Sequence, residues 1–140
     1  MLVKYKMTQP VQSISPDASI KEAAERMRIF NIGVLPVCEH NRVVGILTDR
    51  DIAIRSTAEG HDPQRDQVRY IMSSNVECCY EAQSLETVAQ KMEKRQIHRL
   101  PVLNPDHSLV GILSVSDLAV RGNTQIACEV FEKISEPAHV

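Results

Sequence analysis

An internal repeat is the feature that most constrains this chain, and it emerges when the 140-residue sequence is compared with itself. At an offset of 65, residues 3–37 match residues 68–102 at eleven of 35 positions, whereas composition alone gives about two. One inserted residue then moves the offset to 66, and Gly45–Asp51 lies over Gly111–Asp117. Two long copies do not make a solenoid, so we expect two similar halves packed face to face about a pseudo-twofold axis.

Each copy has the pattern of an α/β unit with the element order strand, helix, strand, strand, helix. Apolar residues recur at i, i+3, i+4 and i+7 from Ile20 and from Leu85, which predicts an amphipathic helix in each copy. Ser19 and Ser84 are expected to cap these helices, and Glu22 completes a capping box in the first copy.

Two β-hairpins and a second pair of helices complete the units. The hairpins are expected over 34–38 with 43–47 and over 99–103 with 109–113. Pro36 and Pro101 lack an N–H donor, which favours an edge strand or the first pairing position. The second helices are expected to start at Asp51 and Asp117.

These patterns predict four regions along the chain: a first unit at 3–60, a linker at 61–71, a second unit at 72–121, and a C-terminal helical extension at 122–140. The extension has an apolar stripe formed by Ala127, Val130, Phe131 and Ile134. This stripe either closes the core or supplies a dimer contact, and the repeat has no counterpart of it.

Composition excludes several classes of protein. With 43% apolar residues and a net charge of −2, the chain is neither disordered nor strongly attracted to phosphate backbones, so we expect no nucleic-acid partner. No apolar run approaches the roughly 18 residues of a membrane helix, and the first residues lack the apolar core of a signal peptide, so we expect a cytoplasmic protein.

The four cysteines Cys38, Cys78, Cys79 and Cys128 contain no C-x-x-C pair. In a reducing compartment they are expected to be small buried hydrophobic residues, and we predict no metal site. A metal or redox role, involving Cys38, Cys78, Cys79 and the scattered histidines, is the alternative.

A hydroxyl residue and an acid stand three positions apart in both copies, as Thr48 with Asp51 and as Ser114 with Asp117. A carboxylate in this position can accept hydrogen bonds from the vicinal diol of a ribose, while the hydroxyl contacts a phosphate. Alternatively, the hydroxyl residues cap a helix and the acids complement its dipole.

The repeated motifs resemble those of a tandem pair of cystathionine β-synthase (CBS) domains, known as a Bateman module. They are Met-Thr/Ser-x-x-Val, Leu-Pro-Val and Gly-Ile-Leu-Thr/Ser-x-x-Asp, and they span residues 3–121. The resemblance implies two β-α-β-β-α units packed through their sheets, clefts between them for adenosine nucleotides, and a homodimer. It also implies that Asp51 and Asp117 bind ribose and that Thr48 and Ser114 contact phosphate or sugar.

The segment His98-Arg99 before Leu-Pro-Val is similar to the basic segment that holds phosphates in adenylate-sensing members of this family. Arg99 offers a planar fork for phosphate oxygens and His98 a further donor. The first copy has Gly33-Val34 instead, so we expect at most one high-affinity nucleotide per chain, and we place Arg99 with Asp117 in preference to Asp51.

The sequence therefore predicts a non-catalytic regulatory module that binds AMP, ADP or ATP, with NAD or S-adenosylmethionine as weaker candidates and a regulated protein as a further partner. The alternative is a ligand-free scaffold for dimerisation or docking. We expect no enzyme, because the chain has no nucleophile elbow, Gly-rich phosphate loop or metal-ligand spacing.

Overall fold

The computed structural model describes residues 1–137, and these form two compact units. The first-repeat unit contains Gln12–Val76. The second-repeat unit joins Met1–Val11 to the chain from Glu77 onward. Both units have the mixed α/β composition expected from the repeat, although the last three residues of the predicted extension, 138–140, lie outside the described residues.

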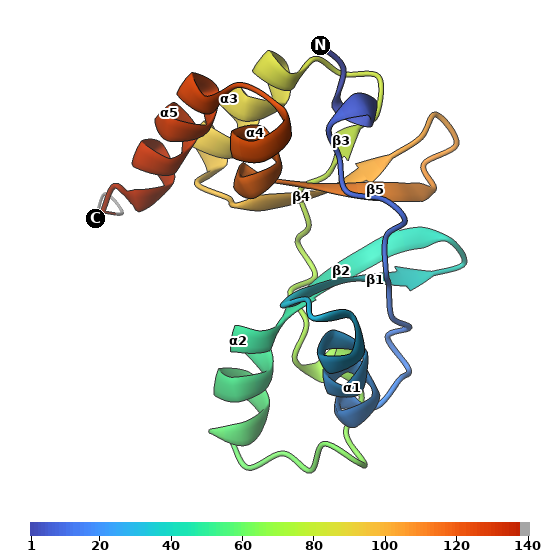
Figure 1. The fold of residues 1–140 in the computed structure, drawn as a ribbon. Helices are drawn as coiled ribbons and strands as arrows, with labels where there is room; N and C mark the ends of the chain where they lie inside the picture. Colours follow the sequence, from blue (N-terminus) through green and yellow to red (C-terminus); the bar gives the residue numbers. More distant parts are fainter. Residues whose placement is uncertain (138–140) are drawn as a thin grey trace. The chain divides into compact units, whose positions relative to one another are not determined.

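The first-repeat unit is a β-hairpin with helices packed against it (Figure 1). Its elements are α1 (Ile20–Phe30), β1 (Val34–Glu39), β2 (Arg42–Thr48), α2 (Asp49–Asp51), a π-helical continuation of α2 (Ile52–Thr57) and a 3-10 turn (Val68–Tyr70). β1 and β2 pair antiparallel. Ile14 adds a parallel bridge to β1, and Ser73 adds an antiparallel bridge to β2.

The second-repeat unit repeats this plan and adds a helix (Figure 1). Its elements are a 3-10 turn (Val3–Tyr5), β3 (Cys79–Tyr80), α3 (Leu85–Arg95), β4 (Arg99–Leu103), β5 (Leu109–Ser114), α4 (Val115–Arg121) and α5 (Thr124–Ser135). The sheet order is β3-β4-β5, with β3 parallel to β4 and β5 antiparallel to it. Pro101 lies in the central strand, ahead of the β4 residues that pair with β3, so its missing N–H leaves the ladder intact.

Each unit is completed by a segment that belongs to the other repeat in sequence. We call residues 3–8 and 68–73 the lead-in segments, because each precedes the first strand of its own repeat. Val3 and Met7 are buried in the core of the second-repeat unit. Val68 and Ile71 are buried in the core of the first-repeat unit. The two repeats therefore exchange their lead-in segments.

The glycine of the Gly-Ile-Leu motif, present in both repeats, makes this exchange possible. A Cβ atom on Gly45 would lie 2.5 Å from Sδ of Met72 and 3.0 Å from the carbonyl oxygen of Ser73. A Cβ atom on Gly111 would likewise lie 2.5 Å from Sδ of Met7. These distances are shorter than van der Waals contact, so the glycines are explained by the close approach of the lead-in segments.

The helix starts confirm part of the predicted capping. The hydroxyls of Ser19 and Ser84 accept hydrogen bonds from backbone N–H groups at the starts of α1 and α3. Glu22 does not complete the box predicted for α1, because its carboxylate lies 3.8 Å from Arg26 in an i,i+4 ion pair instead. The second helices start two residues earlier than predicted, with Thr48 and Ser114 as their N-caps.

Helix α5 belongs to the core of the second-repeat unit. Ala127 and Val130 are buried against α3 and α4, and the side-chain amide of Gln96 donates to backbone carbonyls near the end of α5. Phe131, which shares the predicted stripe, is 58% exposed. The stripe thus closes a core with some of its residues and leaves Phe131 on the surface. Within residues 1–137, no helix combines the length and the apolar character needed to cross a membrane.

Candidate ligand site

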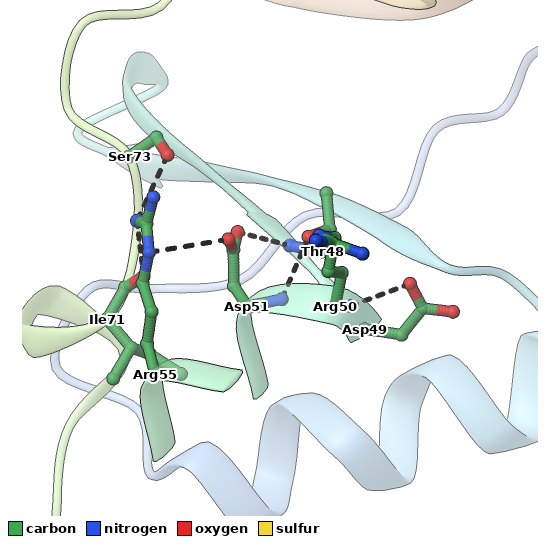
Figure 2. A network of polar contacts seen from close by, with 7 residues as sticks. All are labelled: Thr48, Asp49, Arg50, Asp51, Arg55, Ile71 and Ser73. Atoms are coloured by element: carbon green, nitrogen blue, oxygen red, sulfur yellow. Dashed lines mark hydrogen bonds and ion pairs between the residues drawn. The ribbon is translucent and has the colours of Figure 1, made fainter. Parts of the chain in front are cut away.

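The acidic cap of the first repeat is formed by Thr48 and Asp51 at the end of β2 (Figure 2). The N–H of Asp51 donates to Oγ1 of Thr48 at 3.1 Å, and the N–H of Thr48 donates to Oδ2 of Asp51 at 3.0 Å. This reciprocal pair is a capping box with aspartate in place of the usual glutamate. One carboxylate oxygen, Oδ1 of Asp51, accepts no hydrogen bond from the described residues.

Arg55 stands beside that free oxygen, one helical turn after Asp51 (Figure 2). Its Nε lies 3.7 Å from Oδ1 of Asp51. Its Nη1 donates to the carbonyl oxygen of Ile71 and to Oγ of Ser73, both at 3.2 Å. The side chain of Asp51 is 14% exposed and that of Arg55 is 50% exposed, so solvent reaches this ion pair.

The acidic cap of the second repeat, Ser114 with Asp117, is more fully satisfied. Oδ2 of Asp117 accepts hydrogen bonds from the N–H of Ser114 at 2.9 Å and from its hydroxyl at 3.1 Å. Oδ1 accepts a third, from the hydroxyl of Thr8 in the lead-in segment, at 2.9 Å. Asp117 is only 7% exposed, so both of its oxygens are committed to the protein.

Arg121 occupies the position that corresponds to Arg55, yet it makes a different contact. Its Nη1 donates to the carbonyl oxygen of Met7 at 3.2 Å. Among residues 1–137, it forms no ion pair with Asp117. The two repeats thus share an acid, a lead-in hydroxyl and an arginine, and they connect these groups differently.

His98 and Arg99 lie at the start of β4 and are exposed. Arg99 is the cross-strand partner of Ser114, so the two side chains leave the same face of the sheet. The backbone carbonyl of His98 accepts a hydrogen bond from the N–H of Val115 at 3.0 Å. In the part of the chain that the structure describes, the Arg99 guanidinium has no hydrogen bond or ion pair, which leaves its fork open.

The six predicted site residues therefore fall into two groups. Thr48 and Asp51 meet in the first-repeat unit, and the other four lie in the second-repeat unit: His98, Arg99, Ser114 and Asp117. Sequence analysis missed four polar neighbours of the caps, which are Thr8, Ser73, Arg55 and Arg121. All four were within reach of the repeat comparison, because Thr8 aligns with Ser73 and Arg55 aligns with Arg121.

The cysteines offer no metal centre within residues 1–137, where no group of three or more His, Cys, Asp or Glu side chains is placed to hold an ion. Cys79 is fully buried, and burial raises the pKa of its thiol to about 12. Burial also raises the pKa of Cys38, while a hydrogen bond with Ser13 opposes this shift. Cys128, by contrast, is exposed on α5.

The family model of the CBS domain matches residues 3–56 and 68–121, which are the two copies of the repeat. The chain belongs to the CBS domain family. Its relatives include the CBS domain-containing protein YhcV of Bacillus subtilis, 44% identical over 118 residues, which cover 84% of this chain and 83% of YhcV. The recognition of a CBS domain pair and its α/β fold is thereby confirmed.

Two solved structures of CBS proteins are similar to this chain. The CBS domain pair of protein MJ0100, in complex with 5′-methylthioadenosine and S-adenosyl-L-methionine, is 33% identical with a TM-score of 0.74, covering 85% of this chain and 93% of that one. The hexameric CBS-CP12 protein from bloom-forming cyanobacteria is 30% identical with a TM-score of 0.78, covering 89% and 70%. One related CBS domain pair thus binds two adenosine-containing ligands, and another related CBS protein is hexameric.

Proposed function

We propose that this chain is a non-catalytic regulatory module that binds one adenosine nucleotide, AMP, ADP or ATP, at the cap formed by Thr48 and Asp51. The observation that carries the proposal is Oδ1 of Asp51, which accepts no hydrogen bond within the described residues and faces only the half-exposed Arg55, on a side chain that is 14% exposed. A ribose diol can donate to such an oxygen. The related pair in complex with two adenosine-containing ligands supports this choice of ligand class.

Thr48 supports the same assignment. Its hydroxyl oxygen accepts from the N–H of Asp51, and among residues 1–137 its own O–H proton has no acceptor. The hydroxyl of Ser114, by contrast, donates to Asp117. The first cap can therefore both donate to a phosphate or sugar oxygen and accept from a diol, whereas the second is occupied by internal bonds.

We therefore favour the Thr48–Asp51 cap over the Ser114–Asp117 cap as the ligand site. Sequence analysis placed Arg99 with Asp117 in slight preference to Asp51, and Arg99 is the cross-strand partner of Ser114. In our proposal Asp117, Ser114, Arg99 and His98 form a second, weaker site, because a ligand there must first displace the hydroxyl of Thr8 from the Asp117 carboxylate.

Thermal unfolding with AMP, ADP and ATP tests the proposal. A ligand at ten to one hundred times its dissociation constant should stabilise the chain by about 1.4 to 2.7 kcal/mol. Asp51→Asn should remove this gain, because it keeps an oxygen for the N–H of Thr48 and replaces the free oxygen with a donor. Asp117→Asn is the matched control and should keep the gain. If no adenine nucleotide stabilises the wild-type chain, the proposal is wrong.

We further infer that the chain acts in the cytoplasm as a homodimeric Bateman module that passes its ligand state to a protein partner. The multimeric relative supports assembly beyond one chain. Sedimentation equilibrium with and without AMP measures the oligomeric state directly, and a monomer under both conditions would contradict this inference.

A docking scaffold is the second candidate, and one surface feature favours it. A hollow of about 390 Å³ lies between α4 and α5, lined by Val115, Ala119, Ala127, Cys128 and the exposed Phe131 among others. It contains none of the six predicted ligand residues. Capture of a defined partner that is lost in Phe131→Ser, together with flat titrations of all adenine nucleotides, would favour the scaffold over the sensor.

A further inference from the structure

The guanidinium of Arg55 is only half engaged by the protein. Its Nε faces Oδ1 of Asp51, and its Nη1 donates to Ile71 and Ser73 (Figure 2). Within residues 1–137, Nη2 has no hydrogen-bond acceptor. Two N–H donors of a fixed, permanently charged fork therefore remain open beside the free carboxylate oxygen.

The equivalent positions of the second repeat do not reproduce this arrangement. Arg121 donates to the carbonyl of Met7 and leaves Asp117 to the hydroxyl of Thr8. Arg99, on the neighbouring strand, is the cross-strand partner of Ser114 in that unit, and its counterpart in the first repeat is Val34. The arginine on the helix therefore pairs with the capping acid in the first repeat, whereas in the second repeat it contacts the lead-in backbone instead.

We propose that Arg55 selects the charge of the ligand at the Asp51 cap, favouring an adenosine ligand with an anionic 5′ group over neutral and cationic ones. This inference rests on the proposed function. The diol donates to Oδ1 of Asp51, and a 5′ phosphate accepts from the open Nη2 of Arg55. A phosphate and a guanidinium form charge-assisted hydrogen bonds, whereas a sulfonium at the same carbon is repelled.

The position of Arg55 supports this role over a purely structural one. The i,i+4 ion pair at half exposure contributes little to folding, so the structural role of Arg55 consists mainly of the two hydrogen bonds from its Nη1, which leave Nη2 unused among the described residues. Its contacts with the lead-in segment hold the guanidinium in place without saturating it. A fork that is fixed before the ligand arrives loses less conformational entropy on binding.

Calorimetric titration with three ligands of the same nucleoside tests the inference. AMP carries an anionic 5′ group, adenosine a neutral one and S-adenosylmethionine a cationic sulfonium. The wild-type chain should bind AMP roughly tenfold more tightly than adenosine, and adenosine more tightly than S-adenosylmethionine. Arg55→Gln should bring the three dissociation constants to within about threefold, and Arg55→Lys should keep the order, because it keeps the charge.

Arg121→Gln is the matched control and should keep the full preference for AMP, since Arg121 faces Met7 instead of the acid. Adenosine binding checks that each variant is folded and has an intact Asp51 cap. The inference is overturned if Arg55→Gln keeps the wild-type order, or if Arg99→Gln removes the preference while Arg55→Gln does not. If none of the three ligands binds the wild-type chain, this inference is overturned, and the proposed function fails with it only if ADP and ATP also leave the stability of the chain unchanged.

Discussion

In the second-repeat unit, both oxygens of the capping acid Asp117 are used by the protein, whereas in the first-repeat unit one oxygen of Asp51 faces only a half-exposed arginine. The acids occupy equivalent positions in the repeat and begin equivalent helices. The difference comes from the lead-in segments. Thr8 donates directly to Asp117, while Ser73 accepts from Arg55.

In our proposal, this difference separates two roles of one sequence motif. The capping role needs only one carboxylate oxygen and the N–H of the hydroxyl residue, and both repeats have it. A ligand-binding role needs the second oxygen, and only the first repeat leaves it available. A motif that recurs in both copies therefore predicts where a helix starts more securely than where a ligand binds.

The largest expected effect comes from removing each acid in turn. Asp117→Ala should lower the free energy of unfolding by about 3 kcal/mol, because it leaves the part-buried N–H of Ser114 and the hydroxyl of Thr8 without their acceptor. Asp51→Ala should cost about 1 kcal/mol, since it removes one cap bond and a solvent-exposed ion pair. Urea unfolding measures both.

Glu22→Ala is the control for these two variants. Glu22 stands at the same helical position after Ser19, but its carboxylate makes no cap hydrogen bond within the described residues, so truncating this side chain should change stability by less than about 0.5 kcal/mol. Equal losses of unfolding free energy for Asp117→Ala and Asp51→Ala would contradict our distinction between the two caps, in which the protein uses both oxygens of Asp117 but only one oxygen of Asp51 for hydrogen bonds.

The elements of each unit were predictable because the repeat doubles every local signal. The i, i+3, i+4 stripes from Ile20 and Leu85 gave α1 and α3, and the serines before them gave the caps. The exchange of lead-in segments was not predictable in this way. Alignment of Met7 with Met72 establishes that the two are equivalent, yet it does not say which glycine each one packs against.

The candidate site was likewise predictable from local sequence patterns but not in its tertiary contacts. Thr48 with Asp51 and Ser114 with Asp117 were identified from their spacing, and both pairs do meet. Arg55 and Arg121 continue the same alignment by four residues and were overlooked. Extending the alignment finds both arginines. It does not predict their different partners, because the two residues are identical and aligned, and their contacts depend on the surrounding tertiary structure.

A second contrast between the units concerns the buried residue Cys79, because the equivalent position in the first repeat is occupied by Ile14, which cannot ionise. The unfolded thiol ionises near pH 8.5, whereas burial raises the pKa of Cys79 to about 12 in the folded chain. The folded state therefore keeps a proton that the unfolded state releases, so this stability is present below about pH 8.5 and is lost as the pH rises toward 12.

Between pH 7.5 and 9.5, the wild-type chain should consequently lose about 1.4 kcal/mol more of its unfolding free energy than Cys79→Ala. Urea unfolding of both proteins across this range measures the difference, and groups that titrate equally in both cancel. Cys128→Ser, at an exposed site, should follow the wild-type curve. Parallel curves for the wild type and Cys79→Ala would show that the thiol ionises within the folded unit.

The smallest expected effect concerns Ser56, whose counterpart in the second repeat is Gly122. Ser56 lies in the π-helical turn after α2, is 1% exposed, and its hydroxyl has no hydrogen-bond partner within the described residues. Because an unpaired buried hydroxyl is unfavourable, Ser56→Ala should leave stability unchanged or raise it by up to about 1 kcal/mol. Ser19→Ala, which removes a working cap, should instead lower it by about 1 kcal/mol. A comparable loss in both variants would mean that Ser56 does have a partner, and the first repeat would then be as fully satisfied at this turn as the second.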